Sequence, residues 1–284
     1  MTNKNIAAFA ADSFKGKNII VTGGGSGIGL CTAKQLAQLG ATVFIFGRNV
    51  NKLKSAVETI KQNGGHADYV NLDIREEAQV VKAVSTVVSR CKDIHGLVNN
   101  AGGQFLAPLS HISQRGFEAV VKTNLTGTFL VSREVYNQSM SKCGGSIVNM
   151  LVSGVTGGFP SAGHSGAARA GVFNLTQTAA VEWAASNVRV NAVAPGSIWN
   201  SGMDNYDPKV LNYIKALVKT NPLPRFGTDK EVSNAITFLL SDLASFITGI
   251  SLPINGGETL NTRLWPFPES IIGFNVPEEY LNKP

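Results

Sequence analysis

Short apolar runs rich in β-branched residues alternate along the chain with longer segments in which apolar positions recur every three or four residues. The first pattern is typical of buried strands and the second of amphipathic helices. Strands are predicted at 18–22, 42–46, 67–71, 96–99, 145–150, 188–194 and 251–254. Helices are predicted at 28–39, 51–62, 76–90, 115–140, 163–185, 208–219 and 230–241. This alternation predicts an α/β fold, with a parallel sheet covered by helices on both faces.

The predicted units follow one another without a repeat, a low-complexity tract or a linker. A chain of 284 residues is near the upper size of a single hydrophobic core, so one domain is predicted over residues 16–260. An N-terminal arm (1–15) and a proline-rich C-terminal tail (261–284) flank it. Residues from about 197 to 226 are rich in Asn, Asp and Pro, and both a substrate loop and a long surface connection are compatible with them.

Composition and charge exclude several classes of function. Lys and Arg number 25 against 19 Asp and Glu, but they are dispersed and not interleaved with aromatics, so no nucleic-acid partner is predicted. Three cysteines without CxxC spacing and four histidines without ligand spacing predict neither disulfides nor a metal site. The apolar stretch 238–254 is interrupted by Asp242 and Pro253, and the N-terminus lacks a signal-peptide core. We therefore expect a cytoplasmic protein that binds no membrane.

A glycine-rich turn with the sequence TGGGSGIG (22–29) joins the first predicted strand to the first predicted helix. Small residues let a backbone approach a pyrophosphate, and a helix N-terminus supplies unpaired N–H groups with a partial positive charge. A turn without any ligand is the alternative, but the strand–turn–helix context favours a dinucleotide site. That site is expected at Gly23, Gly25, Ser26, Gly27, Ile28 and Gly29.

Further motifs follow in order: NNAG (99–102) after the fourth strand, Asn124, and Pro-Gly (195–196) after the sixth. Together with the glycine-rich turn, they make residues 16–260 resemble the short-chain dehydrogenase/reductase family. The resemblance implies one Rossmann-type domain with a doubly wound sheet of seven parallel strands, NAD(P)(H), and a homo-oligomer, either tetramer or dimer. It also implies that Asn124 supports a proton-relay water. Residues implied to border the cofactor are Asp73, Ile74, Asn100, Ala101, Gly102, Pro195, Gly196 and Ile198.

The end of the second strand indicates which cofactor is preferred. An acidic residue there would accept hydrogen bonds from the adenosine ribose, whereas this chain has Phe-Gly-Arg-Asn (46–49). Arg48 would instead meet a 2′-phosphate with a forked pair of donors. Lys52 either assists Arg48 or is a solvated helix residue. The sequence thus predicts NADP(H).

The catalytic Ser, Tyr and Lys of carbonyl-reducing family members are all replaced. In those members the Lys follows the Tyr by four residues, and no tyrosine of this chain has a Lys at that spacing. Alignment without gaps places Val152, Ser165 and Arg169 at the three positions. Arg169 keeps a cation for the nicotinamide ribose but cannot shuttle protons, because its pKa is very high. An ordinary ketone or alcohol dehydrogenase is therefore not indicated.

Reduction of a C=C bond conjugated to a thioester tolerates this replacement. Hydride adds to Cβ, and charge develops on the carbonyl oxygen of an enolate, which hydrogen-bond donors must stabilise. We expect Ser165 to stabilise the enolate, helped by Ser153 or by a donor after the sixth strand, while Asn124 orders water. Arg169 completes the catalytic set. The structural alternatives are a turn hydroxyl for Ser153 and a helix-bonded hydroxyl for Ser165.

A longer motif points to one group within the family. Together GFP (158–160) and HSGAARAGV (164–172) resemble the peroxisomal trans-2-enoyl-CoA reductases, with dienoyl-CoA reductases as near relatives. The chain departs from that group at Phe173 and Gln177, where the group has Tyr and Lys, and it ends without a peroxisomal tripeptide. His164, at the start of this motif, is more typical of a structural histidine.

The expected activity is NADPH-dependent reduction of trans-2-enoyl thioesters carried by CoA or acyl carrier protein. Gln104, Phe105 and Tyr206 are expected at the substrate, and aromatic packing explains Tyr206 equally well. Two alternatives stay open. One is a reductase of 3-oxoacyl thioesters or other carbonyls with a substituted site, and the other is a cofactor-binding protein with weak catalysis.

Overall fold

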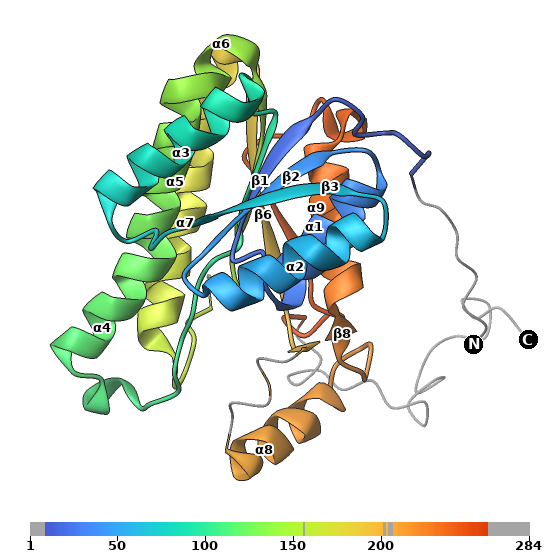
Figure 1. Cartoon of the computed structure of the whole chain (residues 1–284). Coiled ribbons are helices and arrows are strands. Elements are labelled where there is room, and N and C mark those ends of the chain that lie inside the picture. Colours follow the sequence, from blue (N-terminus) through green and yellow to red (C-terminus); the bar gives the residue numbers. More distant parts are fainter. Residues whose placement is uncertain (1–8, 156, 201–202, 204–206, 261–284) are drawn as a thin grey trace, which may run out of the picture.

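A sheet of seven parallel strands runs through the centre of the computed structural model (Figure 1). The structure describes residues 9–155, 157–200, 203 and 207–260. The strands lie in the order β3-β2-β1-β4-β5-β6-β9, so the chain starts in the middle and winds outward to both edges. They are β1 (Asn18–Thr22), β2 (Thr42–Gly47), β3 (His66–Asn71), β4 (Gly96–Asn99), β5 (Gly145–Met150), β6 (Val188–Pro195) and β9 (Ser251–Ile254). The doubly wound fold predicted from the sequence is confirmed, and its switch point lies between β1 and β4.

Helices cover both faces of the sheet, because successive strand residues point to opposite sides. Ile19 and Val21 pack with α1 (Gly27–Gln38), α2 (Val50–Gln62) and α9 (Asp229–Leu240). Ile20 packs on the other side. The helices on that side are α3 (Glu77–Cys91), α5 (Gly127–Val135) and α7 (Gly163–Glu182). Strands buried on both faces explain the continuous apolar runs of the sequence.

The helix predicted over 115–140 is interrupted by two π-helical turns. The segment consists of α4 (Gln114–Val121), a π turn (Lys122–Thr126), α5, a second π turn (Tyr136–Met140) and the short α6 (Ser141–Cys143). A π turn inserts one residue into the helical repeat, so it shifts the direction of the following side chains. The prediction was correct in extent but missed this interruption, which places Asn124 within the first π turn.

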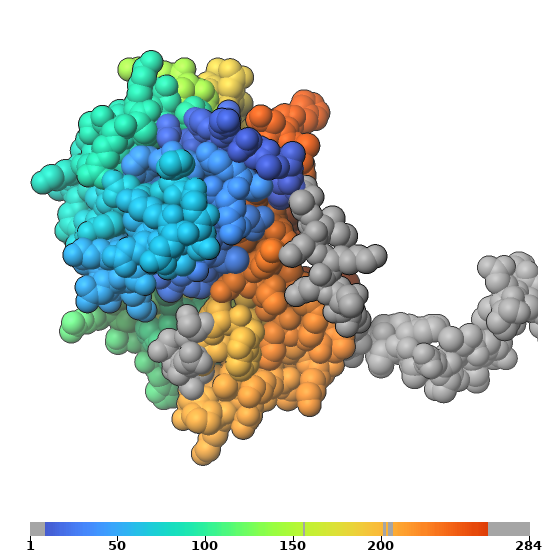
Figure 2. Space-filling view, turned by 45° about the vertical axis from the view of Figure 1, so that its right-hand side comes forward, coloured from blue at the N-terminus to red at the C-terminus, as the bar shows by residue number. Residues whose placement is uncertain are grey.

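The segment from about 197 to 226, rich in Asn, Asp and Pro, contains α8 (Pro208–Val218), whose first turn is capped by Asp207. Two short strands, β7 (Ile198–Trp199) and β8 (Gly227–Thr228), pair in parallel and bring its two ends together. The pairing was not predicted, because a strand of two residues has no readable periodicity. Figure 1 shows α8 at one end of the molecule, away from the body of the sheet, and in Figure 2 its orange atoms lie at the lower end of the molecule.

No helix among the described residues is long and apolar enough to cross a bilayer. No group of three or more His, Cys, Asp or Glu in the same residues is arranged to hold a metal ion. The three cysteines carry free thiols.

Candidate functional site

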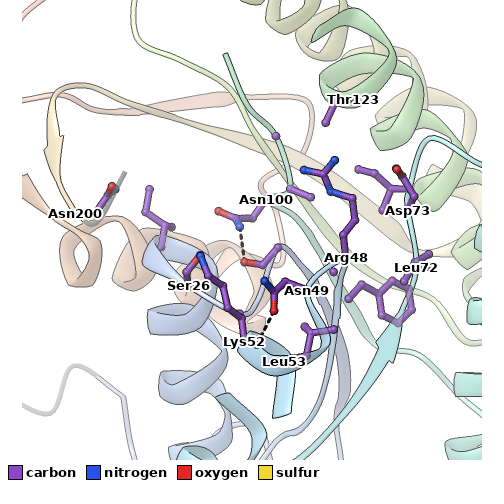
Figure 3. Close-up of a pocket in the computed structure, with 18 residues that line it drawn as sticks. Ser26, Arg48, Asn49, Lys52, Leu53, Leu72, Asp73, Asn100, Thr123 and Asn200 are labelled. Atoms are coloured by element: carbon purple, nitrogen blue, oxygen red, sulfur yellow. Dashed lines mark hydrogen bonds between the residues drawn. The ribbon is translucent and has the colours of Figure 1, made fainter. Parts of the chain in front are cut away.

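A cleft of about 690 Å³ lies at the carboxyl ends of β1, β2, β3 and β4 (Figure 3). We call it the outer cleft. It brings together most of the residues predicted to bind a cofactor: Gly23, Gly25, Ser26, Ile28, Arg48, Asp73, Ile74, Asn100, Ala101 and Gly102. Ligands of doubly wound folds bind at this edge, outside the switch point.

The glycine-rich turn is packed so tightly that side chains would not fit. A Cβ at Gly29 would lie 2.4 Å from the Gly23 carbonyl oxygen and 2.5 Å from Asn100 Nδ2. Gly23 and Gly27 have φ of +66° and +52°, in the left-handed region that favours glycine. Ser26, the N-cap of α1, makes no side-chain capping bond, so the first N–H groups of the helix are left for an anion. This cradle fits the pyrophosphate of a dinucleotide.

The far end of the outer cleft carries positive charge. Arg48 and Lys52 are exposed there, and Asn49 between them caps α2 by accepting a hydrogen bond from the Lys52 N–H at 3.0 Å. Hydrogen bonds from Arg75 hold the pKa of Asp73 below its ordinary value, with a smaller contribution from the charge of Arg48. The carboxylate of Asp73 is therefore ionised and engaged by Arg75, while Arg48 remains directed into the cleft (Figure 3).

A second cavity, of about 300 Å³, continues from the outer cleft at the carboxyl ends of β4, β5 and β6. We call it the inner cavity. Four residues line both spaces: Ile28, Asn100, Gly102 and Asn200. The inner cavity also gathers several predicted site residues: Gln104, Asn124, Ser165, Arg169, Pro195, Gly196 and Ile198. Val152, which replaces the family's serine, lines it too.

Arg169 lies in the wall of the inner cavity with its side chain almost fully buried. Its Nη1 donates to the Met150 carbonyl at 2.6 Å, and its Nη2 lies where a Cβ on Gly102 would be, 2.2 Å from that position. Its Nε is buried without a hydrogen-bond partner in the described structure. Burial lowers the pKa of the guanidinium to about 10, so it stays protonated at neutral pH.

Ser165 lies one helical turn before Arg169 on α7 and is 1% exposed. Its hydroxyl lines the inner cavity and has no hydrogen-bond partner among the described residues. Its backbone N–H donates to His164 Nδ1 at 2.9 Å, so the proton of a neutral His164 lies on Nε2. Ser165 is therefore a free donor facing the cavity rather than a hydroxyl bonded to its own helix.

Asn124 fixes the loop that follows β4. Its Oδ1 accepts from the Gly103 N–H at 2.9 Å, and its Nδ2 donates to the Gly103 carbonyl at 3.0 Å. Its own carbonyl accepts a hydrogen bond from Thr128 Oγ1 at 2.8 Å. In this structure the side chain of Asn124 positions Gly102 and Gln104 at the cavity wall.

Two of the predicted residues, Ser153 and Phe105, do not line the inner cavity. The hydroxyl of Ser153 accepts a hydrogen bond from Asn255 Nδ2 at 2.8 Å, as the turn alternative supposes. Phe105 packs edge-on against the buried ring of His164, with ring centroids 4.3 Å apart. Tyr206 lies outside the described residues. Sequence reasoning also missed Asn200, which follows β7 and borders both spaces, because the position of that loop depends on the β7–β8 pairing.

Comparison with known proteins finds relatives that match most of the length of this chain. A family model described as Enoyl-(Acyl carrier protein) reductase matches residues 23–259. Peroxisomal 2,4-dienoyl-CoA reductase of Mus musculus is 34% identical over 93% of this chain and 89% of its own length. The 3-oxoacyl-(acyl-carrier-protein) reductase FabG of Thermotoga maritima is 37% identical over 86% and 98%. The solved structure of the citronellol catabolism dehydrogenase AtuB of Pseudomonas aeruginosa PAO1 is 50% identical, covers 88% of this chain and 98% of that chain, and has a TM-score of 0.80.

Proposed function

Because the chain belongs to the short-chain dehydrogenase/reductase family, whose members bind a nicotinamide cofactor, we propose that it is an NADPH-dependent reductase of trans-2-enoyl thioesters. The observation that carries the proposal is the pair Ser165 and Arg169 in the wall of the inner cavity. This pair offers hydrogen-bond donors and a fixed positive charge, but neither side chain is a general acid near neutral pH. Relatives named for acyl-CoA and acyl-carrier-protein substrates support an acyl thioester.

When bound, the nicotinamide cofactor supplies the hydride that adds to Cβ of the substrate. The N-terminus of α1 would hold the pyrophosphate, and Arg169 would hold the nicotinamide end. The free hydroxyl of Ser165 donates to the thioester carbonyl oxygen and stabilises the enolate charge that develops there. Arg169 delivers no proton to that oxygen, because its pKa of about 10 lies well above neutral pH. A proton taken from solvent water then adds to Cα and completes the reduction.

The preference for NADPH is supported by the charges at the far end of the outer cleft. Arg48 and Lys52 are the basic side chains that line it there, and the chain has no carboxylate directly after β2. A 2′-phosphate gains charge-assisted hydrogen bonds from a guanidinium, whereas a 2′-hydroxyl gains far less. We also propose that the chain forms a homo-oligomer, a tetramer or a dimer.

A second candidate function is oxidation or reduction at a carbinol or carbonyl carbon. It is favoured by the 50% identity to a protein named as a citronellol catabolism dehydrogenase and by the likeness to a 3-oxoacyl reductase. Against it stands the replacement of Tyr and Lys by Ser165 and Arg169, because a nascent alkoxide needs a proton that Arg169 does not release.

Substrate panels separate the candidates. NADPH oxidation is measured with trans-2-enoyl-CoA, 2,4-dienoyl-CoA and 3-oxoacyl-CoA, and NADP⁺ reduction with citronellol. Turnover of the enoyl substrates and not of the other two supports the proposal. Turnover confined to 3-oxoacyl-CoA or citronellol overturns it in favour of the second candidate. Tight NADPH binding without turnover on any member of the panel indicates a cofactor-binding protein.

A further inference from the structure

The guanidinium of Arg169 is a buried positive charge without a counter-ion among the described residues. It donates its hydrogen bond to a neutral acceptor, the Met150 carbonyl. A buried charge is normally compensated by an opposite one, because leaving water is costly. The uncompensated charge therefore acts on whatever occupies the inner cavity.

Fold geometry indicates what lies beside it. A dinucleotide bound across the switch point places one nucleotide over β1–β3 and the other over β4–β6. Arg48 marks the first half as the 2′-phosphate end, so the nicotinamide half falls in the inner cavity. There Arg169 contacts Gly102 after β4 and Met150 at the end of β5. The nicotinamide ring is positively charged in the oxidised cofactor and neutral in the reduced one.

We propose that Arg169 makes the site bind the reduced nicotinamide cofactor more tightly than the oxidised one. This preference favours reduction of the substrate over its oxidation. The inference rests on the proposed use of a nicotinamide cofactor, but not on the identity of the acyl substrate. Two like charges close together repel, so the oxidised ring is disfavoured while the neutral ring is not.

The neighbouring acidic groups do not neutralise the charge of Arg169. Glu258 lies beside Gly196 in the cavity wall, but it is half-buried and accepts a hydrogen bond from the Ser197 N–H at 3.2 Å. Asp73 is ion-paired with Arg75 in the outer cleft. Neither carboxylate acts on the pKa of Arg169, which only burial shifts. Arg169 keeps its charge across the physiological pH range, because its pKa of about 10 lies well above that range.

The test is a direct measurement of cofactor binding. Dissociation constants for NADPH and NADP⁺, and for NADH and NAD⁺, are determined by calorimetry with the full-length protein at pH 7.5. For the native chain we expect the oxidised form to bind at least about tenfold more weakly than the reduced form. Equal affinities, or tighter binding of the oxidised form, would overturn the proposal.

Variants test whether the charge of Arg169 causes the preference for the reduced cofactor. Arg169→Met is expected to reduce the ratio of the two constants by about tenfold, whereas Arg169→Lys retains it. Arg189→Met is the matched control, because Arg189 also donates to main-chain carbonyls but lies at the opposite end of β6. An unchanged ratio in Arg169→Met, a lost ratio in Arg169→Lys, or the same loss in Arg189→Met contradicts the inference.

Two further outcomes remain decisive. If Arg169→Met fails to fold, as judged by circular dichroism, the native ratio and the Arg169→Lys ratio still decide the case. If the protein turns over a carbonyl substrate rather than an enoyl thioester yet prefers the reduced cofactor, the inference stands and the proposed substrate does not. Its failure and that of the proposed function are thus distinguishable.

Discussion

Ser165 and Arg169 face the same cavity because they are four residues apart on one helix. Both residues are buried. The Ser165 hydroxyl lines the cavity without a hydrogen-bond partner among the described residues, so a ligand there can accept a hydrogen bond from it. The Arg169 Nε is buried without a partner in the described structure, and an unpaired buried polar group costs about 1–3 kcal/mol of folding free energy. The pair is therefore suited to binding rather than to stabilising α7.

Replacing Ser165 by Ala tests the proposed enolate donor. We expect kcat for a trans-2-enoyl-CoA to fall by roughly 10²-fold, because one pre-positioned donor to the developing oxyanion is lost. The dissociation constant for NADPH should change little. Ser233→Ala controls for general effects. It removes another buried hydroxyl, on α9, which donates to the Gln35 side chain at 2.6 Å. A larger loss in Ser153→Ala than in Ser165→Ala would instead make Ser153 the donor.

Replacing Arg48 by Ala tests the cofactor preference. We expect kcat/KM with NADPH to fall by about 10- to 100-fold, because the 2′-phosphate loses a charge-assisted contact. The value with NADH should stay nearly constant, since the ribose hydroxyl needs no guanidinium. Lys52→Ala, at the same end of the cleft, separates a specific guanidinium contact from a general effect of positive charge. A native enzyme that works better with NADH contradicts the assignment.

Among the elements, all seven predicted strands of the main sheet occur within one residue of their predicted ends, because buried parallel strands carry a strong local pattern. The π turns and the β7–β8 pair were missed. The amide of Asn124 contacts Gly103, 21 residues away, and β7 pairs with a strand at Gly227–Thr228, so both depend on distant contacts. For the same reason the sequence located the glycine turn but not the contact of Ser153 with Asn255. Local motifs could be recognised in the sequence, whereas contacts between residues far apart in the sequence could not be predicted.

The N-terminus of α9 gives a prediction about stability and pH. Thr228 and Glu231 form a capping box, and hydrogen bonds from Arg225 and then Thr228 lower the pKa of Glu231 from 4.5 to about 2. A lowered carboxylate pKa in the folded state stabilises the protein above the unfolded pKa, and this contribution is lost as pH falls. Glu231→Gln should therefore lower the free energy of unfolding by about 1 kcal/mol at pH 7, since the pair is exposed and screened.

The same comparison at low pH completes the test. The difference between native protein and Glu231→Gln, measured by urea unfolding, should shrink as pH falls from about 4.5 towards 2. Glu58→Gln, on an exposed position of α2, provides the control and should behave like the native protein. A difference that stays constant over this range would show that the charge of Glu231 does not stabilise the helix start.

For the molecule as a whole, one end of the sheet forms the candidate site, and the other end anchors α9. The carboxyl ends of the strands form the outer cleft and the inner cavity. At the opposite end Arg189 of β6 donates to the carbonyls of Leu239 and Ser241 at 2.7 and 3.1 Å, and so fixes the end of α9 to the sheet. Among the described residues, no further strand pairs with the outer edge of β9, and this edge borders the same region. An unpaired strand edge is a surface that proteins usually cover.

The surface beside the start of β9 predicts the oligomeric state. Leu243 and Phe246 are largely or fully exposed just before this strand, and Ile250 adjoins it. Exposed apolar side chains next to an open strand edge favour burial against a second copy of the chain. We expect the native protein to sediment at equilibrium as a dimer or tetramer, and Phe246→Glu to shift it to smaller species. Val81→Glu, an exposed apolar position on α3, should leave the mass unchanged. A native protein of monomer mass would refute the oligomer itself, whereas an unchanged mass in Phe246→Glu would show that another surface holds it together.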